Sequence, residues 1–288
     1  MLTDLRDRLG KIVFERVAGA DGPKHRDRIH NTPGERWFAD DRPIRTVHAD
    51  SSMFVGGLRA LLLQSLHPLA MAGVAGHSGY RGDPWGRLQR TSYFLAVTTF
   101  GLAEDADEAV ARVRSVHARV RGKAPDGRPY SAADPHLLRW VHVAEVDSFL
   151  DTYQRYGTAP LDQAGRDGYV ADEAFIARKL GIVDPPTTEA ELREQLAAFR
   201  PELEGSAEAR ATARYLLLRP PLPLIARPPY AVLGAASVAS LPRWARRPLA
   251  LPPQLPITEA TAVRAAGKAV VGMLRWVTTP PAAEAPAA

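Results

Sequence analysis

The apolar positions of this chain recur mainly at three- and four-residue intervals, which is the spacing of amphipathic helices. No convincing run of alternating apolar and polar residues and no Asn-Gly turn favours a β-sheet. The pattern predicts an all-α fold that forms one multi-helix domain. Helices are expected at residues 87–101, 104–122, 135–157, 162–180, 188–200, 206–218 and 258–277.

Residues 51–75 form the most apolar stretch of the chain, and no Asp or Glu occurs between Asp50 and Asp83. A helix that is apolar on all sides is usually a buried one, so this stretch is expected to run through the middle of the fold. Pro68 lacks a backbone donor and should kink or end the helix one residue after His67.

Composition divides the chain into four parts. Residues 1–45 are expected to supply an N-terminal helix and a lead-in, and residues 46–218 the helical core. Residues 219–279 follow as a Pro-rich segment with a terminal helix, and residues 280–288 as a disordered tail.

The segment at residues 219–256 carries ten prolines together with several large apolar side chains. Burying each such side chain is worth about 1.5–3 kcal/mol, so we expect an ordered wrap along the core, with one short helix, rather than a linker. Arg243, Arg246 and Arg247 are expected to remain outside, where they could make a peripheral contact with anionic lipid.

The 288 residues include 37 Lys and Arg, 32 Asp and Glu and no Cys, which gives a formal net charge of +5. The lack of Cys excludes disulfides, Fe–S clusters, Cys-ligated zinc and thiolate-ligated haem. A metal centre would rest on ligands such as His or carboxylate. The small basic excess has no aromatic-spaced motif that favours nucleic acid. With no signal-like N-terminus and no apolar run of about 18 residues, the expected location is the cytoplasm.

His117 lies on the apolar stripe of the helix expected at residues 104–122, with Arg114 and Arg121 on the same side. Neighbouring cations lower the pKa of an imidazole and keep it neutral, which is the form that binds a metal. The two guanidinium groups also suit a dianionic ligand, such as the propionates of haem. The alternative is a core histidine bonded to a backbone carbonyl, with both arginines paired to acids.

Arg87, Arg90, Thr91 and Phe94 share one face of the preceding helix, by their i, i+3, i+4, i+7 spacing. This face offers two positive charges and a hydroxyl group. It is either the polar rim of a cofactor pocket or a solvated face with one aromatic anchor.

Three further histidines are candidates for pocket positions. His142 lies on the inward stripe of the helix at residues 135–157, near Glu145, and is a rival axial ligand or a structural core histidine. His67 precedes the helix-breaking proline, and His77 lies in a Gly-rich loop. Each could line a pocket or satisfy the backbone of its turn.

Other common chemistries lack their motifs. The sequence His48-Ala-Asp50 resembles part of a two-His-one-carboxylate iron site, but that motif normally sits on a β-barrel scaffold. No zinc-protease, nucleophile-elbow or P-loop motif occurs. Gly56-Gly57 indicates close helix packing rather than phosphate binding.

Four stretches, at residues 55–78, 87–91, 113–122 and 130–150, together resemble the catalytic domain shared by latex-clearing protein (rubber oxygenase) and MpaB-type oxygenases. The resemblance covers residues 45–200 and, more loosely, the Pro-rich C-terminus. It implies an all-helical domain that binds haem b through a histidine and uses O₂ or peroxide on an apolar substrate.

In this resemblance His117 is similar to the proximal axial ligand, and Arg114 and Arg121 to the arginines that bracket it. Arg87 and Thr91 match an Arg and a Thr of the distal motif. The resemblance and the candidate residues described above together predict a site with His117 as the iron ligand, a set of cofactor-binding residues and a set of catalytic residues. The cofactor-binding set is His117, Arg87, Arg114, Arg121 and His67, and the catalytic set is Arg90, Thr91 and His77.

Two departures from the rubber oxygenases change the expected substrate. Those enzymes have a Lys that can occupy the distal iron position where this chain has Arg90, a poor metal ligand, so an open or water-bound position is expected. They also use a Glu base before the distal motif, whereas residues 51–82 contain no acid. The expected function is a haem b-dependent oxygenase that acts on an apolar, isoprenoid-like or secondary-metabolite substrate, and the two departures argue against polyisoprene. The alternatives are a haem peroxidase or peroxygenase and a non-catalytic protein that binds haem or an apolar ligand.

Overall fold

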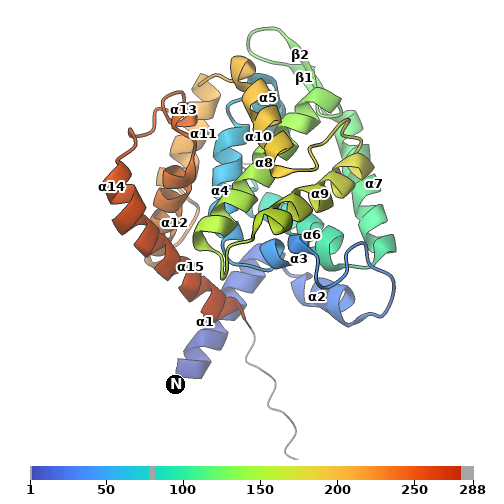
Figure 1. Ribbon diagram of the computed structural model, residues 1–288, viewed down its shortest axis with the longest axis vertical. Coiled ribbons are helices and arrows are strands. Elements are labelled where there is room, and N and C mark those ends of the chain that lie inside the picture. The colour runs from blue at the N-terminus through green and yellow to red at the C-terminus, as the bar shows by residue number, and fades with distance from the viewer. Residues whose placement is uncertain (1, 78–81, 280–288) are drawn as a thin grey trace, which may run out of the picture.

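The computed structural model describes residues 2–77 and 82–279 and confirms the all-α prediction (Figure 1). The helices of the first part are α1 (Leu2–Ala18), α2 (Gly22–Asn31), α3 (Pro43–His48), α4 (Met53–Gln64), α5 (Pro68–His77), α6 (Pro84–Phe100) and α7 (Ala103–Arg119). A small antiparallel hairpin of β1 (Arg121–Lys123) and β2 (Pro129–Ser131) follows.

The second part is again helical. Its elements are α8 (Pro135–Tyr156), α9 (Gln163–Leu180), α10 (Glu189–Ala198), η1 (Arg200–Glu202), α11 (Ala207–Leu218), η2 (Leu224–Ala226), α12 (Arg227–Ser240), α13 (Arg243–Arg246), α14 (Pro256–Thr258), η3 (Glu259–Val263) and α15 (Arg264–Thr278). The tail predicted at residues 280–288 lies outside the described residues.

Helices α4 and α8 form the central pair of the fold and pack together more extensively than any other two elements. Gly56 allows their close approach, because a Cβ atom at this position would lie 2.5 Å from Cδ1 of Phe149. Arg59 is only 3 % exposed between the two helices. It donates to Oγ of Ser148 at 2.7 Å, and its Nη2 lies 2.7 Å from Oδ2 of Asp147.

The apolar stretch breaks before Pro68, as predicted, and α5 bends away from α4 by 110°. The expectation of a buried position holds for α4, in which no residue is exposed, but is wrong for α5, in which only Met71 is buried. After the bend, α5 contacts the β-hairpin and α11, and these neighbours leave most of its apolar surface half-covered.

Helix α7 was expected to continue to Gly122 but ends at Arg119. Val120 takes an extended backbone conformation, and Gly122 pairs with Tyr130 in the hairpin. A Cβ atom at Gly122 would lie 2.6 Å from the Tyr130 hydroxyl oxygen, so glycine permits the ring to lie over the strand. Pairing between strands thus replaces the last helical turn.

The Pro-rich segment contains more helix than expected. Its α12 is 14 residues long, because both of its prolines stand in the first turn, where a missing N–H costs nothing. Ser237 of α12 donates to the carbonyl oxygen of Val55 at 3.0 Å, which attaches this helix to α4. Leu224 and Ile225 are exposed, against the expectation that the large apolar side chains of this segment are covered.

The expectation that Arg246 remains outside is also wrong. Its side chain is 3 % exposed and binds the Glu259 carboxylate through two hydrogen bonds, at 2.6 and 2.8 Å. Glu259 at the start of η3 covers the guanidinium, whereas Arg243 and Arg247 are exposed. A buried arginine of this kind requires its acidic partner, because an unpaired charge is costly inside a protein.

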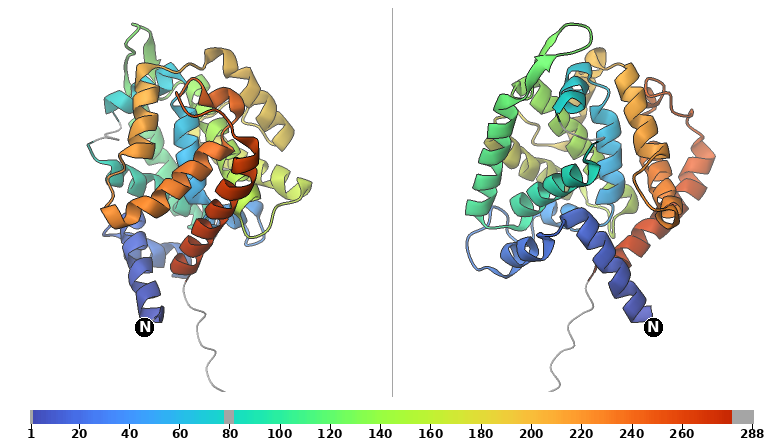
Figure 2. Two further views of the ribbon diagram at one scale, coloured as in Figure 1. Left: turned by 90° about the vertical axis from the view of Figure 1, so that its left-hand side faces the viewer. Right: turned by 180° about the vertical axis from the view of Figure 1, so that it is seen from behind.

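The last helix returns to the beginning of the core. Figure 2 shows α15 crossing beside α12 toward α1, which extends from the body of the protein. Arg275 binds the buried Asp50 carboxylate, with Nη2 2.7 Å from Oδ2 and Nε 3.0 Å from the same oxygen. This ion pair joins the turn before α4 to the last helix.

We predict that Arg59→Ala lowers the free energy of unfolding by about 3 kcal/mol, because it removes the hydrogen bond to Ser148 and leaves Asp147 unpaired. Urea unfolding followed by circular dichroism measures the change. Arg112→Ala is the matched control, since Arg112 forms an exposed pair with Glu108 worth about 0.3–0.5 kcal/mol. Equal losses in the two variants would contradict this account of the α4–α8 pair.

Candidate functional site

Helices α6 and α7 form a hairpin that carries most of the predicted site residues. The buried residues of both helices lie near the connection between them. In α6 these are Val97, Thr98 and Thr99, and in α7 they are Ala106, Ala109 and Val110. The outer halves contain no fully buried side chain, and they hold the two predicted motifs. The view from behind in Figure 2 shows the two helices diverging away from their connection.

His117 lies in the last turn of α7 and is half-buried. Its ring makes no hydrogen bond within the described residues, and burial alone lowers its pKa below the ordinary 6.5. The imidazole is therefore neutral at pH 7 and keeps a nitrogen lone pair available for a ligand. Its lowered pKa has a different cause from the one expected, since burial rather than the neighbouring arginines produces it.

Arg114 and Arg121 are both exposed, and neither pairs with a carboxylate among the residues described here. Arg114 donates to the carbonyl oxygen of Lys179 at 3.3 Å, and Arg121 to that of Ala118 at 2.8 Å. Arg121 belongs to β1 rather than to the helix. Both guanidinium groups retain donors that could bind an anionic group.

The motif on α6 is positioned by a well-formed helix start. Asp83 caps the helix by accepting from Gly86 N at 2.8 Å. The same carboxylate lies 3.3 Å from Nη1 of Arg90, in an exposed ion pair. Thr91 is exposed and Arg87 is half-buried. Phe94 packs against the main core, as the aromatic anchor predicted for this face.

His77 ends α5 and is exposed, with Nδ1 3.3 Å from the Tyr130 hydroxyl group. Gly73 and Gly76 pass close to the same tyrosine, and a Cβ atom on Gly76 would lie 3.1 Å from its hydroxyl oxygen. The end of α5 is thus attached to the β-hairpin that follows α7. The chain segment that connects α5 to α6 lies in part outside the described residues.

His67 occupies a different environment from the other predicted residues. Its ring is 3 % exposed in the turn between α4 and α5, and it packs near the rings of His136 and Trp140. Nε2 of His67 lies 3.5 Å from Oε2 of Glu202, but neither ring nitrogen has a hydrogen-bond partner. His136 contacts both oxygens of the same carboxylate. Motif analysis missed this group because its members are far apart in the sequence.

A buried polar network between α3, α6, α8 and α9 was also missed. His48 lies 2.8 Å from Oγ1 of Thr99 and 2.9 Å from Oε1 of Glu173, and Tyr169 donates to the same carboxylate at 3.3 Å. Burial opposes ionisation of Glu173, but the contact with His48 outweighs it and holds the pKa of this carboxyl below its ordinary value. Only the Tyr169–Glu173 spacing, one helical turn, could have indicated the network.

Two ionisable side chains of α8 extend this network. His142 is buried, as predicted, but its Nε2 has no hydrogen-bond partner, and burial lowers its pKa to about 4. Burial raises the pKa of Glu145 to about 8, and the Glu173 carboxylate acts in the same direction. At pH 7 both groups are therefore uncharged, and the Glu145 carboxyl holds a proton in the interior.

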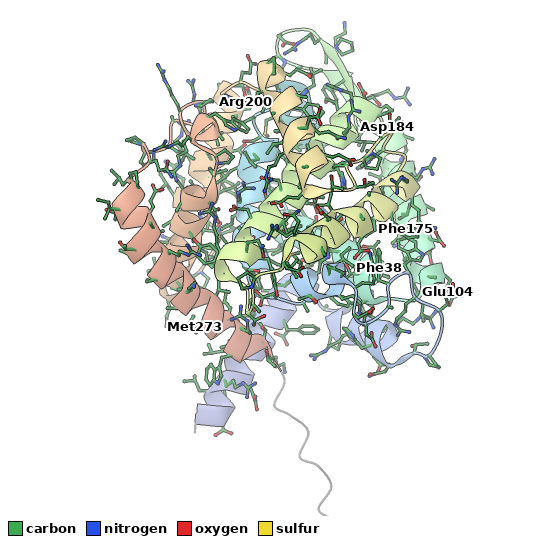
Figure 3. The ribbon with its side chains drawn as sticks, in the orientation of Figure 1. Phe38, Glu104, Phe175, Asp184, Arg200 and Met273 are labelled. Carbon is green, nitrogen blue, oxygen red and sulfur yellow. The ribbon has the colours of Figure 1, made fainter. Side chains whose placement is uncertain are left out.

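His48 and Asp50, the two polar residues of the His48-Ala-Asp50 sequence, take part in separate interactions and do not form one iron site. His48 belongs to the buried network, whereas Asp50 binds Arg275. Figure 3 shows Phe38 and Phe175 together beside α9, where their rings make an edge contact at 5.7 Å. Phe38 is buried there, whereas Phe175 remains 38 % exposed.

Across residues 2–77 and 82–279, no single helix is long and apolar enough to span a bilayer. The bent pair α4 and α5 passes that test only when the two helices are combined, and α4 is largely buried in the protein.

Comparison with known proteins identifies a family. The sequence model of the family described as "ER-bound oxygenase mpaB/B'/Rubber oxygenase, catalytic domain" matches residues 45–276, which is most of the chain. This agrees with the resemblance found in the sequence. No solved structure matches the chain.

Two curated relatives are uncharacterized proteins, one from Mycobacterium bovis and one from Mycobacterium tuberculosis. Each is 33 % identical to this chain over 99 residues, which cover 34 % of the chain and 36 % of the relative. The matched region thus spans about a third of the length of these relatives.

We predict that Glu145→Gln makes stability less dependent on pH. Between pH 4.5, the ordinary pKa of Glu, and about 8, native Glu145 holds a proton that the unfolded chain releases. Stability from this group is therefore complete below pH 4.5 and is lost as pH rises toward 8. The glutamine amide has no such proton, so the free energy of unfolding of the variant relative to wild type should rise by about 1–3 kcal/mol from pH 5 to pH 8.

Urea unfolding at the two pH values measures this difference, and Glu194→Gln, an exposed change on α10, is the control. The same relative stability of Glu145→Gln at both pH values would show that the carboxyl is ionised in the fold.

Proposed function

Because this chain belongs to the family of MpaB-type oxygenases and rubber oxygenases, we propose that it is a haem b-dependent oxygenase that acts on a small or medium apolar substrate. The proposed iron ligand is His117. The observation that carries the proposal is its half-buried ring, which has no hydrogen-bond partner among the described residues. The nitrogen lone pair of this neutral imidazole is not used by any protein donor within the described part of the chain, so a metal ion could take it up.

The donor set around His117 fits haem b. A neutral imidazole is a common axial ligand of haem iron, and Arg114 and Arg121 offer cations for two propionates. In this proposal, side chains of the outer halves of α6 and α7 and of the half-covered surface of α5 would contact the macrocycle. When bound, haem b would supply the binding and activation of the oxidant, a chemistry that the protein residues lack.

The residues of α6 have a supporting role in this proposal. The pair between Arg90 and Asp83 is exposed and weak, so the guanidinium is free to exchange Asp83 for a bound anion or oxidant at little cost. Thr91 offers a hydroxyl donor one residue further on. Neither side chain is a good iron ligand, and a substrate could approach the site from this side.

Other histidines fit the iron less well. His142 is enclosed in the main core near Glu173, and His67 packs against α8 beside Glu202. His77 is exposed and contacts Tyr130, so we propose it for the rim of the site rather than for the metal. Activity measurements with supplied substrates, in the presence of O₂ or of peroxide, would identify the oxidant and the substrate.

We predict that His117→Ala folds but binds at least about tenfold less haem than wild type, because it lacks the only strong bond between protein and iron. The pyridine haemochrome assay on purified protein gives the haem content per chain, and circular dichroism reports folding. His142→Ala tests the rival ligand, and His30→Ala, at an exposed position on α2, is the neutral control. A colourless His142→Ala and a red His117→Ala would overturn the assignment.

We also predict that imidazole, cyanide or CO would shift the Soret band of the purified protein, because the guanidinium of Arg90 stays protonated and would not bind the iron in their place. Absorption titration measures the shift. A low-spin spectrum that none of these ligands alters would mean that a protein side chain already fills the position. Oxidation of a supplied alkene, with O₂ or peroxide, separates an enzyme from a binding protein.

A further inference from the structure

We propose that His67, His136 and Glu202 form a binding site for a divalent transition metal ion, with Zn²⁺ as the probe. The three side chains come from the turn between α4 and α5, the first turn of α8, and η1. The site is distinct from the proposed haem ligand His117 and does not depend on haem binding.

The spacing of the donor atoms matches a metal site. All three lie within 4.8 Å of one another. Ligand atoms about 2.05 Å from a tetrahedral Zn²⁺ are about 3.3 Å apart. Nε2 of His67 and Oε2 of Glu202 are 3.5 Å apart, while Nε2 of His136 is 2.8 Å from the same oxygen. The donor atoms of His67 and His136 lie within 4.8 Å of each other, so the two rings would close in by at most about 1.5 Å to reach tetrahedral spacing.

His67 supplies the second, independent observation. Its ring is 97 % withdrawn from solvent, yet neither nitrogen has a hydrogen-bond partner. Buried polar side chains nearly always have a partner, so an unpartnered ring whose Nε2 lies close to a carboxylate needs an explanation. A metal ion between His67 and Glu202 would provide it.

The surrounding contacts hold the three segments together without a metal. Glu204 donates its backbone N–H to the carbonyl oxygen of Leu66 at 2.9 Å, which places η1 beside the His67 turn. Trp140 donates to the carbonyl oxygen of Gln64 at 3.2 Å. The ring of Phe199 lies 4.8 Å from that of His136, centroid to centroid. Such preorganised side chains lose little entropy on binding an ion.

The local charge is compatible with a cation. Arg128 contributes positive potential near His67, but its guanidinium is paired with Asp126 at 2.6 Å. Two neutral imidazoles and one carboxylate leave a divalent ion with a net charge of +1, which solvent can screen because the His136 and Glu202 side chains are 43 % and 42 % exposed. The same exposure gives the ion a path to the site.

The ligand types select the class of metal. Two imidazoles favour zinc, copper, iron or nickel over the hard cations calcium and magnesium, which prefer oxygen ligands. Three protein ligands leave a fourth tetrahedral position for water, as in catalytic zinc sites. The ion would connect residues 67, 136 and 202, so binding would also stabilise the fold.

The test is Zn²⁺ binding to the purified full-length protein after dialysis against a chelator. We expect one Zn²⁺ per chain by isothermal titration calorimetry and a higher melting temperature. X-ray absorption at the zinc edge should show nitrogen and oxygen neighbours at about 2.0–2.1 Å. His136→Ala and Glu202→Gln should each weaken binding by at least about 10–100-fold, the loss typical of less direct perturbations of metal sites.

The matched controls are His30→Ala and Glu194→Gln, which remove exposed side chains of the same types elsewhere. They should bind Zn²⁺ as wild type does. The proposal is overturned if Zn²⁺ leaves the melting temperature of the wild type unchanged, or if all four variants bind equally. Haem content, measured in the same samples, separates this result from the haem proposal, because loss of haem with normal Zn²⁺ binding would count only against the latter.

Discussion

The close contact between α4 and α8 is the constraint on which the rest of the fold depends. It requires Gly56, because any side chain there would collide with Phe149, and it encloses the charge of Arg59. A buried guanidinium is tolerated only where its donors are satisfied, and Ser148 and Asp147 of α8 satisfy them together with the carbonyl oxygen of Ser240. Once this pair is fixed, the turn after α4 and the start of α8 must lie side by side, which brings the histidines of both segments together.

Local sequence signals determined much of the fold, and long-range contacts determined what could not be predicted. Asp134 and Pro135 marked the start of α8, because an N-cap and a proline in the first turn act within a few residues. The end of α7 was misplaced, since Gly122 pairs with Tyr130 across a turn. The burial of Arg246 also depends on a partner from a later segment, which no local pattern reveals.

The residues of the candidate sites also differ in whether a local sequence pattern could identify them. His117 could be identified because its stripe and flanking arginines lie on one short segment, and the structure adds that its ring lacks a partner among the described residues. The group of His67, His136 and Glu202 could not be identified, because its members are joined only by folding. The spacing of His142 and Glu145 on α8 was visible, but the shift in the Glu145 pKa depends on burial and on Glu173 from α9.

The ion pair between Asp50 and Arg275 has a consequence for synthesis of the protein in the cell. The two residues are 225 positions apart. At 5–20 residues per second, a ribosome needs about 11–45 s to reach Arg275 after it has made Asp50. During that interval the nascent chain has no partner for this carboxylate and no α15 to cover its side of the core. The apolar α4 is then incompletely enclosed, which is the condition that chaperones recognise, and the domain reaches its native state only after α15 has been made.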